Sequence, residues 1–383
     1  MITTPITAEL IRGALELVPT ERGLLPHRLP ARVGTRGADA TVLQAARQPS
    51  GVRVALRTAA TVIELETLPT KPVYPGAPPR PDGVYELLVD RHPVDRRTAP
   101  GGNSMIIDLA TGASRVEPGP TQTIRFDGLP AGDKDVEIWL PYNEITELIM
   151  LRSDAPVAPL PERGRPVWLH HGSSISHGSN ADSATATWPA VAAALGGMEL
   201  INVGLSGNAL LDPFVARALR DTPADLISIK IGINVVNADL MRLRAFGPAV
   251  HGFLDTIRDG HPDTPLLVVS PIHCAIHETT PGPTAMDPSG FAEGRLSFYA
   301  AGDAAEATEL ATGKLTLSRI RETLAGIVEQ RSADDPNLRY LDGLRLYGPD
   351  DEAELPLPDR LHPGPEAHRR IGERFAALAL APS

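Results

Sequence analysis

The sequence has little cysteine, few aromatic residues and no long apolar run. Only Cys274 among the 383 residues is a cysteine, so no disulfide can form within the chain, which favours a reducing compartment. No stretch approaches the roughly 18 uninterrupted apolar residues of a membrane helix. The N-terminus also lacks the basic segment followed by an apolar one that marks a secretory leader. We therefore expect a cytoplasmic protein with no membrane partner.

Positive charge is also in deficit. The chain has 36 Lys and Arg against 47 Asp and Glu, a net charge of −11. This balance argues against a nucleic-acid partner, or an anionic membrane surface, held by electrostatic attraction. Hydrophobic residues make up 42% of the chain, enough for a sizeable core, and the length allows two or three domains.

Residues 1–155 have the pattern of an antiparallel β-sandwich. Short β-rich runs recur between clusters of Gly, Pro and Asp, at residues 52–56, 61–65, 84–89, 104–108, 121–126 and 136–141. Only residues 9–17 have a helical pattern. A Pro-rich segment, residues 156–166, then predicts a linker.

From residue 167 to residue 383 the pattern changes to alternating strands and helices. Strands are expected at residues 167–170, 199–205, 226–231, 266–271 and 338–341, and helices at 186–195, 209–219, 248–259, 317–330 and 365–380. This alternation predicts a parallel sheet covered on both faces, with functional loops at the carboxyl ends of its strands. Residues 274–313 break the rhythm, and a loop of that length is usually functional or disordered.

Three short segments that follow expected strands could carry chemistry. HHGSSISHG, residues 170–178, offers hydroxyl groups on a flexible turn, as a serine nucleophile needs, although many such loops are rich in Gly and Ser. NVGLSGN, residues 202–208, contains glycines that could present a backbone N–H to an oxyanion, or could simply form a turn. IGIN, residues 231–234, ends in an asparagine that could donate to the same oxyanion or cap a helix.

A fourth segment, DRLHP at residues 359–363, precedes the last expected helix. An aspartate three residues before a histidine can orient the imidazole and stabilise its charged form. The alternative is a capped helix start. The order of the four segments indicates more than any one of them, because all follow strands of one α/β unit and could meet at one edge of its sheet.

These segments resemble the conserved blocks of the SGNH (GDSL-type) hydrolase family, from about residue 167 to the C-terminus. The resemblance implies a flavodoxin-like, three-layer α/β domain and a serine esterase mechanism without a cofactor. By position, Ser174 matches the nucleophile, His362 its general base and Asp359 the acid that orients the base. The backbone N–H groups of Ser174 and Gly207 and the side chain of Asn234 match the oxyanion hole.

Two positions depart from the family pattern. Ser173 and Val235 each stand where the family usually has aspartate. Neither aspartate belongs to the triad, so the resemblance implies that the chemistry survives. In the family the two aspartates are expected to support the loops, so their loss affects the detailed geometry expected here.

An N-terminal jelly-roll-like sandwich before an SGNH domain is similar to the plan of family 2 carbohydrate esterases. That resemblance implies a small acyl ester as the substrate, with an acetylated sugar or glycoside favoured, and leaves room for a homo-oligomer. A thioesterase or lipid esterase with the same triad is one alternative. A non-catalytic carbohydrate-binding protein that kept the fold is another. Histidines cluster near Ser174, but without acidic residues at ligand spacing, so no metal is expected.

Overall fold

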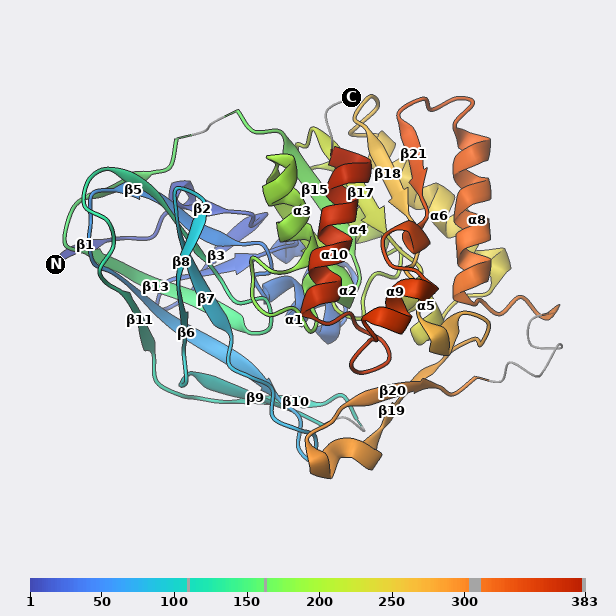
Figure 1. The fold of residues 1–383 in the computed structure, drawn as a ribbon, viewed down its shortest axis with the longest axis horizontal. Helices are drawn as coiled ribbons and strands as arrows, with labels where there is room; N and C mark the ends of the chain where they lie inside the picture. Colours follow the sequence, from blue (N-terminus) through green and yellow to red (C-terminus); the bar gives the residue numbers. More distant parts are fainter. Residues whose placement is uncertain (109–110, 162–163, 303–310, 381–383) are drawn as a thin grey trace. The chain divides into compact units, whose positions relative to one another are not determined.

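The computed structural model describes all residues except 109–110, 162–163, 303–310 and 381–383. It divides into two compact units (Figure 1). The N-terminal unit is Met1–Arg165 with Ser183–Thr185, and the C-terminal unit is Pro166–Asp182 with Ala186–Ser383. Among the described residues, no helix is long and apolar enough to cross a membrane.

The N-terminal unit contains two β-sheets. Within the described ranges the larger sheet has the order β10-β9-β6-β13-β4-β3, with β1 on β13 and β11 on β6, and the smaller has the order β14-β5-β12-β7-β8, with β2 on β5. Strands β6 and β9 run parallel and the other pairs are antiparallel. The bounds are β1 (Ile2–Thr4), β2 (Ile11–Arg12), β3 (Glu16–Pro19), β4 (Leu24–His27), β5 (Arg53–Thr58), β6 (Ile63–Val73), β7 (Val84–Val89), β8 (His92–Thr98), β9 (Asn103–Ile107), β10 (Ser114–Glu117), β11 (Gln122–Phe126), β12 (Lys134–Trp139), β13 (Ile145–Ser153) and β14 (Val157–Pro159).

One apolar core lies between these sheets. Alternate residues point inward, as Ile63 and Leu65 do on β6 and Val54 and Leu56 on β5, because successive side chains of a strand face opposite sides. The predicted β-sandwich is therefore confirmed. A helix that the sequence pattern did not predict, α1 (Ala40–Arg47), begins after Asp39, whose carboxylate accepts hydrogen bonds from the first helical N–H groups.

Two expectations for this unit are wrong. Residues 9–17 do not form a helix: a short 3-10 helix, Ala8–Leu10, leads into β2, and Gly13 then adopts a positive φ of 84° that no helix allows. The segment 156–166 is not all linker, because β14 pairs with β5 and so satisfies its backbone hydrogen bonds within the sheet. Residues 162–163 of that segment lie outside the described residues.

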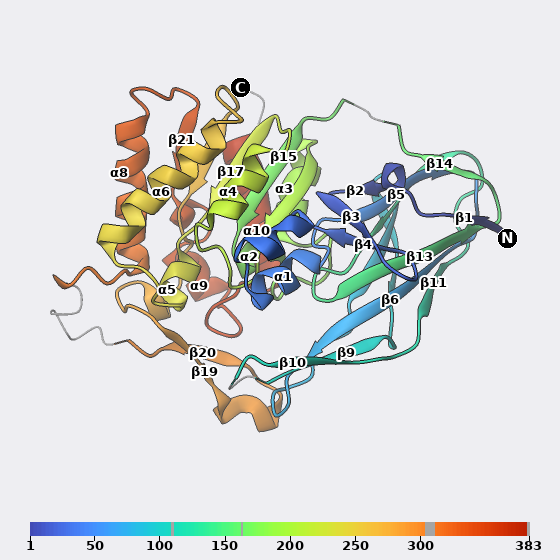
Figure 2. The ribbon, with the colours of Figure 1, turned by 180° about the vertical axis from the view of Figure 1, so that it is seen from behind.

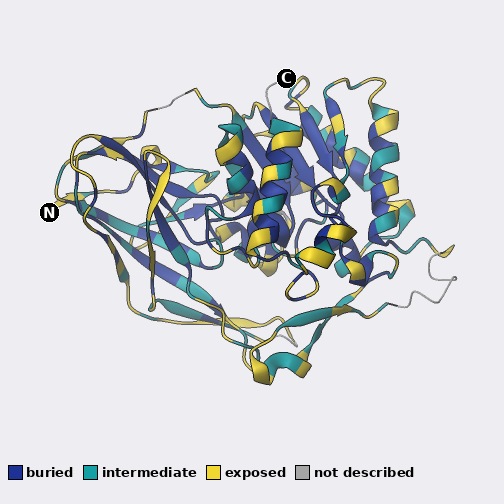
Figure 3. Cartoon of the chain, viewed as in Figure 1, coloured by how far each residue is buried: buried dark blue, intermediate teal, exposed yellow. Residues whose placement is uncertain are grey.

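The C-terminal unit is built on a parallel sheet with the order β16-β15-β17-β18-β21. In chain order this is 2-1-3-4-5, the flavodoxin-like arrangement, and the predicted fold class is confirmed. The bounds are β15 (Val167–Gly172), β16 (Glu199–Gly204), β17 (Leu226–Lys230), β18 (Leu266–Val269) and β21 (Leu338–Leu341). The central strands are buried along nearly their whole length (Figure 3), as a sheet covered on both faces requires.

Helices cover both faces of this sheet, as ring contacts on β15 demonstrate. On one face the Trp168 ring lies 4.9 Å from Phe375 of α10 and 6.0 Å from Trp188 of α3, between ring centroids. On the other face His171 lies 5.9 Å from Phe253 of α6, the face that also carries α4 and α8 (Figure 2). The helices are α2 (Ser174–His177), α3 (Trp188–Gly196), α4 (Pro213–Arg220), α5 (Ile233–Asn237), α6 (Leu243–Arg258), α8 (Leu317–Arg331), α9 (Pro349–Glu354) and α10 (Pro365–Phe375), which continues as a π-helical turn, Ala376–Leu380.

The segment 274–313 is more than a loop. It contains a two-stranded antiparallel ribbon, β19 (Thr284–Asp287) and β20 (Ser297–Ala300), joined through a 3-10 helix, Pro288–Glu293. Residues 303–310 lie outside the described residues. We call β19 and β20 with their connection the ribbon.

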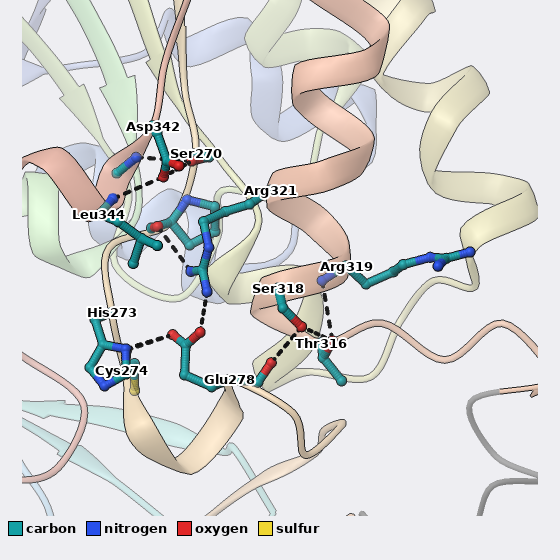
Figure 4. A network of polar contacts seen from close by, with 12 residues as sticks. Ser270, His273, Cys274, Glu278, Thr316, Ser318, Arg319, Arg321, Asp342 and Leu344 are labelled. Carbon is teal, nitrogen blue, oxygen red and sulfur yellow. Dashed lines mark hydrogen bonds and ion pairs between the residues drawn. The ribbon is translucent and has the colours of Figure 1, made fainter. Parts of the chain in front are cut away.

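A polar network holds the start of this segment against α8 (Figure 4). Glu278 is its centre: the Cys274 N–H donates to Oε1 at 3.0 Å, His273 Nδ1 lies 3.3 Å from the same oxygen, and Arg321 of α8 pairs with Oε2. The Ser318 hydroxyl donates to the Glu278 carbonyl oxygen at 2.8 Å. These bonds fix the chain shortly before the ribbon begins.

Candidate active site

Ser174 lies at the carboxyl end of β15 and begins the short helix α2. The turn before it is tight. A Cβ on Gly172 would approach the Ser176 hydroxyl to 2.3 Å, so only glycine fits there. Ser173, in the position of the family aspartate, caps α2 by accepting a hydrogen bond from the Ile175 N–H at 3.3 Å. Ser174 is 9% exposed, so the turn holds its hydroxyl at the edge of the sheet with little contact to solvent.

The structure brings Ser174 together with the other two predicted triad residues. Ser174 Oγ lies 2.9 Å from His362 Nε2, and His362 Nδ1 lies 2.8 Å from Asp359 Oδ2. The serine is 188 residues from the histidine in sequence, so this contact is purely tertiary. The three side chains form a continuous hydrogen-bonded chain in the order that nucleophilic catalysis needs.

A turn of the backbone positions Asp359 against His362. Arg360, between them, has a positive φ of 67°, which is unusual for a residue with a side chain. The turn lets Asp359 Oδ1 accept hydrogen bonds from the N–H groups of Leu361, at 3.0 Å, and His362, at 2.7 Å. The other carboxylate oxygen, Oδ2, is thereby directed at the imidazole.

These bonds set the ionisation of Asp359 and the tautomer of His362. Burial by itself would raise the pKa of Asp359, but the hydrogen bond and charge of His362, with the two backbone N–H groups, lower it below the ordinary value. The carboxylate is thus ionised at neutral pH and can only accept. His362 Nδ1 must then carry the proton, which leaves Nε2 free to accept the proton of Ser174.

Asn180 is a site residue that the sequence analysis missed. Its side-chain nitrogen donates to Asp359 Oδ2 at 3.0 Å, on the same oxygen that faces His362. Asn180 has a positive φ of 65°, a conformation that asparagine tolerates better than most residues. Its position in a Gly- and Ser-rich loop was the sole signal in the sequence.

The two further predicted residues lie on neighbouring loops at the same ends of the strands. Gly207, after β16, has a positive φ of 72°. Asn234 lies in the first turn of α5, after β17, and its Oδ1 accepts a hydrogen bond from the Ala209 N–H at 3.0 Å. That bond ties the asparagine block to the glycine block and fixes which end of the amide donates, so the Nδ2 group remains as a donor. The oxyanion role of both residues stays a prediction.

A buried polar layer supports the turn that carries Ser174. His170 lies 2.7 Å from the Ser228 hydroxyl through Nδ1 and 2.8 Å from the Ser176 hydroxyl through Nε2. Complete burial holds the pKa of His170 well below its ordinary value, so the ring is neutral. Burial likewise lowers the pKa of His368 to about 4; His368 Nδ1 accepts a hydrogen bond from the Trp188 N–H, and Nε2 bonds the Ser179 carbonyl oxygen. These histidines position the loop and do not titrate near neutral pH.

Cys274, the one cysteine of the chain, is a small buried residue. It is 2% exposed, and burial raises the pKa of its thiol to about 12. A thiol that stays protonated is a poor nucleophile. Cys274 is therefore no rival to Ser174.

The ribbon reaches the predicted triad. The Phe298 N–H of β20 donates to the Asp359 carbonyl oxygen at 3.0 Å. The Phe298 ring also meets the His362 ring edge-on, with centroids 5.8 Å apart and planes at 74°. Strand β20 thus extends over the loop that carries Asp359 and His362.

Known proteins share both the sequence pattern and the fold. The sequence profile of the GDSL-like lipase/acylhydrolase family matches residues 171–370, just over half of the chain. No curated protein sequence matches the sequence of this chain. Among solved structures, a salicylyl-acyltransferase from a tetracycline biosynthetic pathway, SsfX3, is 28% identical, with a TM-score of 0.80 over 100% of this chain and 98% of the other.

Two further structures share the fold. A putative GDSL-like lipase from Bacteroides ovatus is 20% identical, with a TM-score of 0.67 over 96% of this chain and 93% of the other. A family two carbohydrate esterase from Clostridium thermocellum is 13% identical, with a TM-score of 0.56 over 86% and 91%. The similarity to the plan of these carbohydrate esterases, inferred above from sequence, is confirmed at the level of the fold. The chain belongs to the GDSL-like lipase/acylhydrolase family and is a serine carboxylic ester hydrolase.

Proposed function

We propose that this enzyme cleaves small acyl esters through an acyl-enzyme on Ser174. The observation that carries the proposal is the hydrogen-bonded chain from Ser174 through His362 to Asp359. In this assignment Ser174 is the nucleophile, His362 the general base and Asp359 the acid that orients it. The N–H groups of Ser174 and Gly207 and the side chain of Asn234 bind the oxyanion.

The reaction has two balanced halves. His362 Nε2 takes the Ser174 proton while Oγ attacks the ester carbonyl carbon, and the carbonyl oxygen becomes an oxyanion held by three donors. Collapse of this tetrahedral intermediate breaks the bond to the alcohol, which leaves with the proton from His362. In the second half His362 activates water, which attacks the acyl-enzyme and releases the carboxylic acid. Asp359 stays ionised and stabilises the imidazolium that forms in each half.

The substrate class we favour is an acetyl ester of a sugar or glycoside. The support is similarity in fold to the carbohydrate esterases, which covers both units of the chain. A thioesterase or lipid esterase would use the same residues. A non-catalytic binding protein is disfavoured, since binding alone gives no reason to keep an ionised aspartate, a single histidine tautomer and a serine in hydrogen-bond contact.

A second candidate is acyl transfer to an alcohol. The specific observation in its favour is the 28% identity to a salicylyl-acyltransferase along the whole of both chains. The chemistry differs only in the second half, where an acceptor hydroxyl replaces water as the nucleophile that His362 activates. Its acyl donor would be an activated ester or thioester, and an aromatic acyl group is the analogue to test first.

One set of assays tests both candidates. With p-nitrophenyl acetate, an acyl-enzyme predicts a burst of p-nitrophenol near one equivalent per chain, wherever deacylation is the slower half. Ser174→Ala should abolish the burst and turnover. Adding an acceptor alcohol to the wild type at saturating donor separates the candidates: a transferase forms new ester at the expense of acid, whereas a hydrolase forms acid alone. Absence of any acyl-enzyme with acetyl, butyryl and salicyl donors would reject the proposal.

A further inference from the structure

The two faces of the ribbon differ in what they meet. In an antiparallel pair, residues directly opposite one another share a face, and the next residue along points the other way. Met286 lies opposite Phe298, so both occupy the face that meets the His362 ring. Tyr299, opposite Ala285, lies on the reverse face and is 43% exposed.

The triad geometry tells which part of a substrate this face would meet. His362 Nε2 must reach the oxygen of the departing alcohol to protonate it, so the alcohol part of the ester lies beside the imidazole. The acyl oxygen instead lies on the side of the oxyanion donors. The Phe298 ring packs edge-on against the imidazole, with both rings only partly exposed. An apolar surface there borders the alcohol and not the acyl chain.

We propose that Met286 and Phe298 form the wall of a subsite for the alcohol moiety, and that this wall selects alcohols with an apolar ring face. The proposal rests on the proposed function, because it needs His362 as the acid and base. A flat aromatic side chain and a flexible thioether suit a ring whose C–H groups or π-face can lie against them.

The same subsite would receive the incoming nucleophile. By microscopic reversibility, an acceptor alcohol attacks the acyl-enzyme from the position that the leaving alcohol vacated, with His362 now as base. A wall that favours ring-bearing alcohols therefore favours them as acceptors over water and small alcohols. The ribbon thus influences the ratio of transfer to hydrolysis as well as the choice of ester.

The anchoring of the ribbon makes such a wall effective. The Phe298 N–H is bonded to the Asp359 carbonyl, and the chain before β19 is held to α8 through Glu278. At the base of the ribbon, the Thr284 hydroxyl lies 2.6 Å from His277 Nε2 and donates to Asn237 Oδ1 at 2.9 Å. Because these contacts hold the ribbon in place, the ribbon loses little conformational entropy when its side chains contact a substrate.

The test varies the alcohol and the acyl group independently in the full-length enzyme. One series is ethyl acetate against benzyl acetate, and the other is p-nitrophenyl acetate against p-nitrophenyl butyrate. For Phe298→Ala we expect the benzyl-to-ethyl ratio of kcat/KM to fall by about tenfold, the usual scale for loss of an aromatic contact. The acetate-to-butyrate ratio of kcat/KM should stay within about twofold of the wild-type value. Tyr299→Ala, on the same strand but the reverse face, should leave both ratios as in the wild type.

Several outcomes would overturn the proposal. An active Phe298→Ala enzyme with an unchanged benzyl-to-ethyl ratio would show that the ring does not border the alcohol. A change in the acyl ratio alone would place the wall on the acyl side. If Phe298→Ala does not fold, Met286→Ala and Phe298→Leu must shift the alcohol ratio in the same direction or the proposal fails. A wild type inactive on all four esters, with no acyl-enzyme, would reject the proposed function itself.

The acceptor side gives an independent measurement. With a p-nitrophenyl ester as donor, Phe298→Ala should lower the yield of benzyl ester relative to acid when benzyl alcohol is added, and change the yield with ethanol much less. Equal losses with both alcohols would mean that the substitution disturbs His362 and not a subsite.

Discussion

Replacing Asp359 by asparagine tests the electrostatic core of the site with almost no change in shape. The carboxylate has two sets of partners, the backbone N–H groups of Leu361 and His362 on Oδ1 and the donors His362 Nδ1 and Asn180 Nδ2 on Oδ2. All four are donors, and an amide can offer oxygen to only one set. If the amide oxygen accepts the two backbone N–H groups, the NH₂ group of the asparagine faces the other two donors, His362 Nδ1 and Asn180 Nδ2.

The result is a wrong tautomer at His362. An NH₂ group opposite Nδ1 favours the form with the proton on Nε2, which can no longer accept the proton of Ser174. The imidazolium that forms during the reaction also loses its adjacent negative charge. Both effects act on the transition state, and together they should lower kcat by about 10³- to 10⁴-fold, or about 4 to 5.5 kcal/mol of barrier.

The assay is the steady-state rate with p-nitrophenyl acetate from pH 6 to pH 9, beside thermal unfolding of the same samples. Asp350→Asn, an exposed aspartate of α9, is the control for loss of a charge and should keep the wild-type rate. A loss below about tenfold for a folded Asp359→Asn enzyme would refute the reasoning. The site would then work as a Ser–His dyad, and the hydrogen bonds around Asp359 would be structural.

Three further predictions concern the nucleophile, the oxyanion and buried histidine. Ser174→Ala should lower turnover by several orders of magnitude and leave unfolding near the wild type; a near-normal Ser174→Ala beside an inactive Ser173→Ala would move the nucleophile by one residue. Asn234→Ala should reduce kcat by about 10²- to 10³-fold with less effect on KM, and a change in KM alone would argue against an oxyanion role. His368 stays neutral in the folded state down to about pH 4, whereas in the unfolded chain it takes up a proton below about pH 6.5. Between these pH values the unfolded state binds more protons, so the free energy of unfolding should fall as the pH falls. This residue should contribute up to about 3 kcal/mol of that fall. Urea unfolding of the wild type and His368→Gln should show a flatter pH dependence in the variant, and equal slopes would contradict the assignment.

Local sequence determined the elements of this fold wherever the periodicity was strong. The expected strands at 84–89 and 338–341 coincide with β7 and β21. The order of four short blocks along an alternating α/β pattern also carried the resemblance to the SGNH family, which implied Ser174, Asp359 and His362 as the triad. Each block follows a strand, and the carboxyl ends of parallel strands meet at one edge whatever the connections between them.

Long-range pairing decided what the sequence pattern could not. Residues 157–159 look like linker in isolation and become strand β14 because β5 offers them partners. The helical pattern at 9–17 gives way because Gly13 turns the chain and Ile11 pairs with Val54. In each case the backbone hydrogen bonds of a distant strand outweigh a weak local preference.

The same distinction applies within the site. The sequence supplied the candidates for the reacting groups, because the serine, histidine and aspartate match the family blocks in residue type and spacing. It did not reveal Asn180, which contacts an aspartate 179 residues away, and it did not show that Phe298 is the aromatic residue of the ribbon that meets His362. Those contacts exist because the chain returns to the same edge of the sheet from three separate loops. The sequence by itself therefore determined the family and the candidate residues for its chemistry, and only the tertiary structure decided which other side chains contact Asp359 and His362.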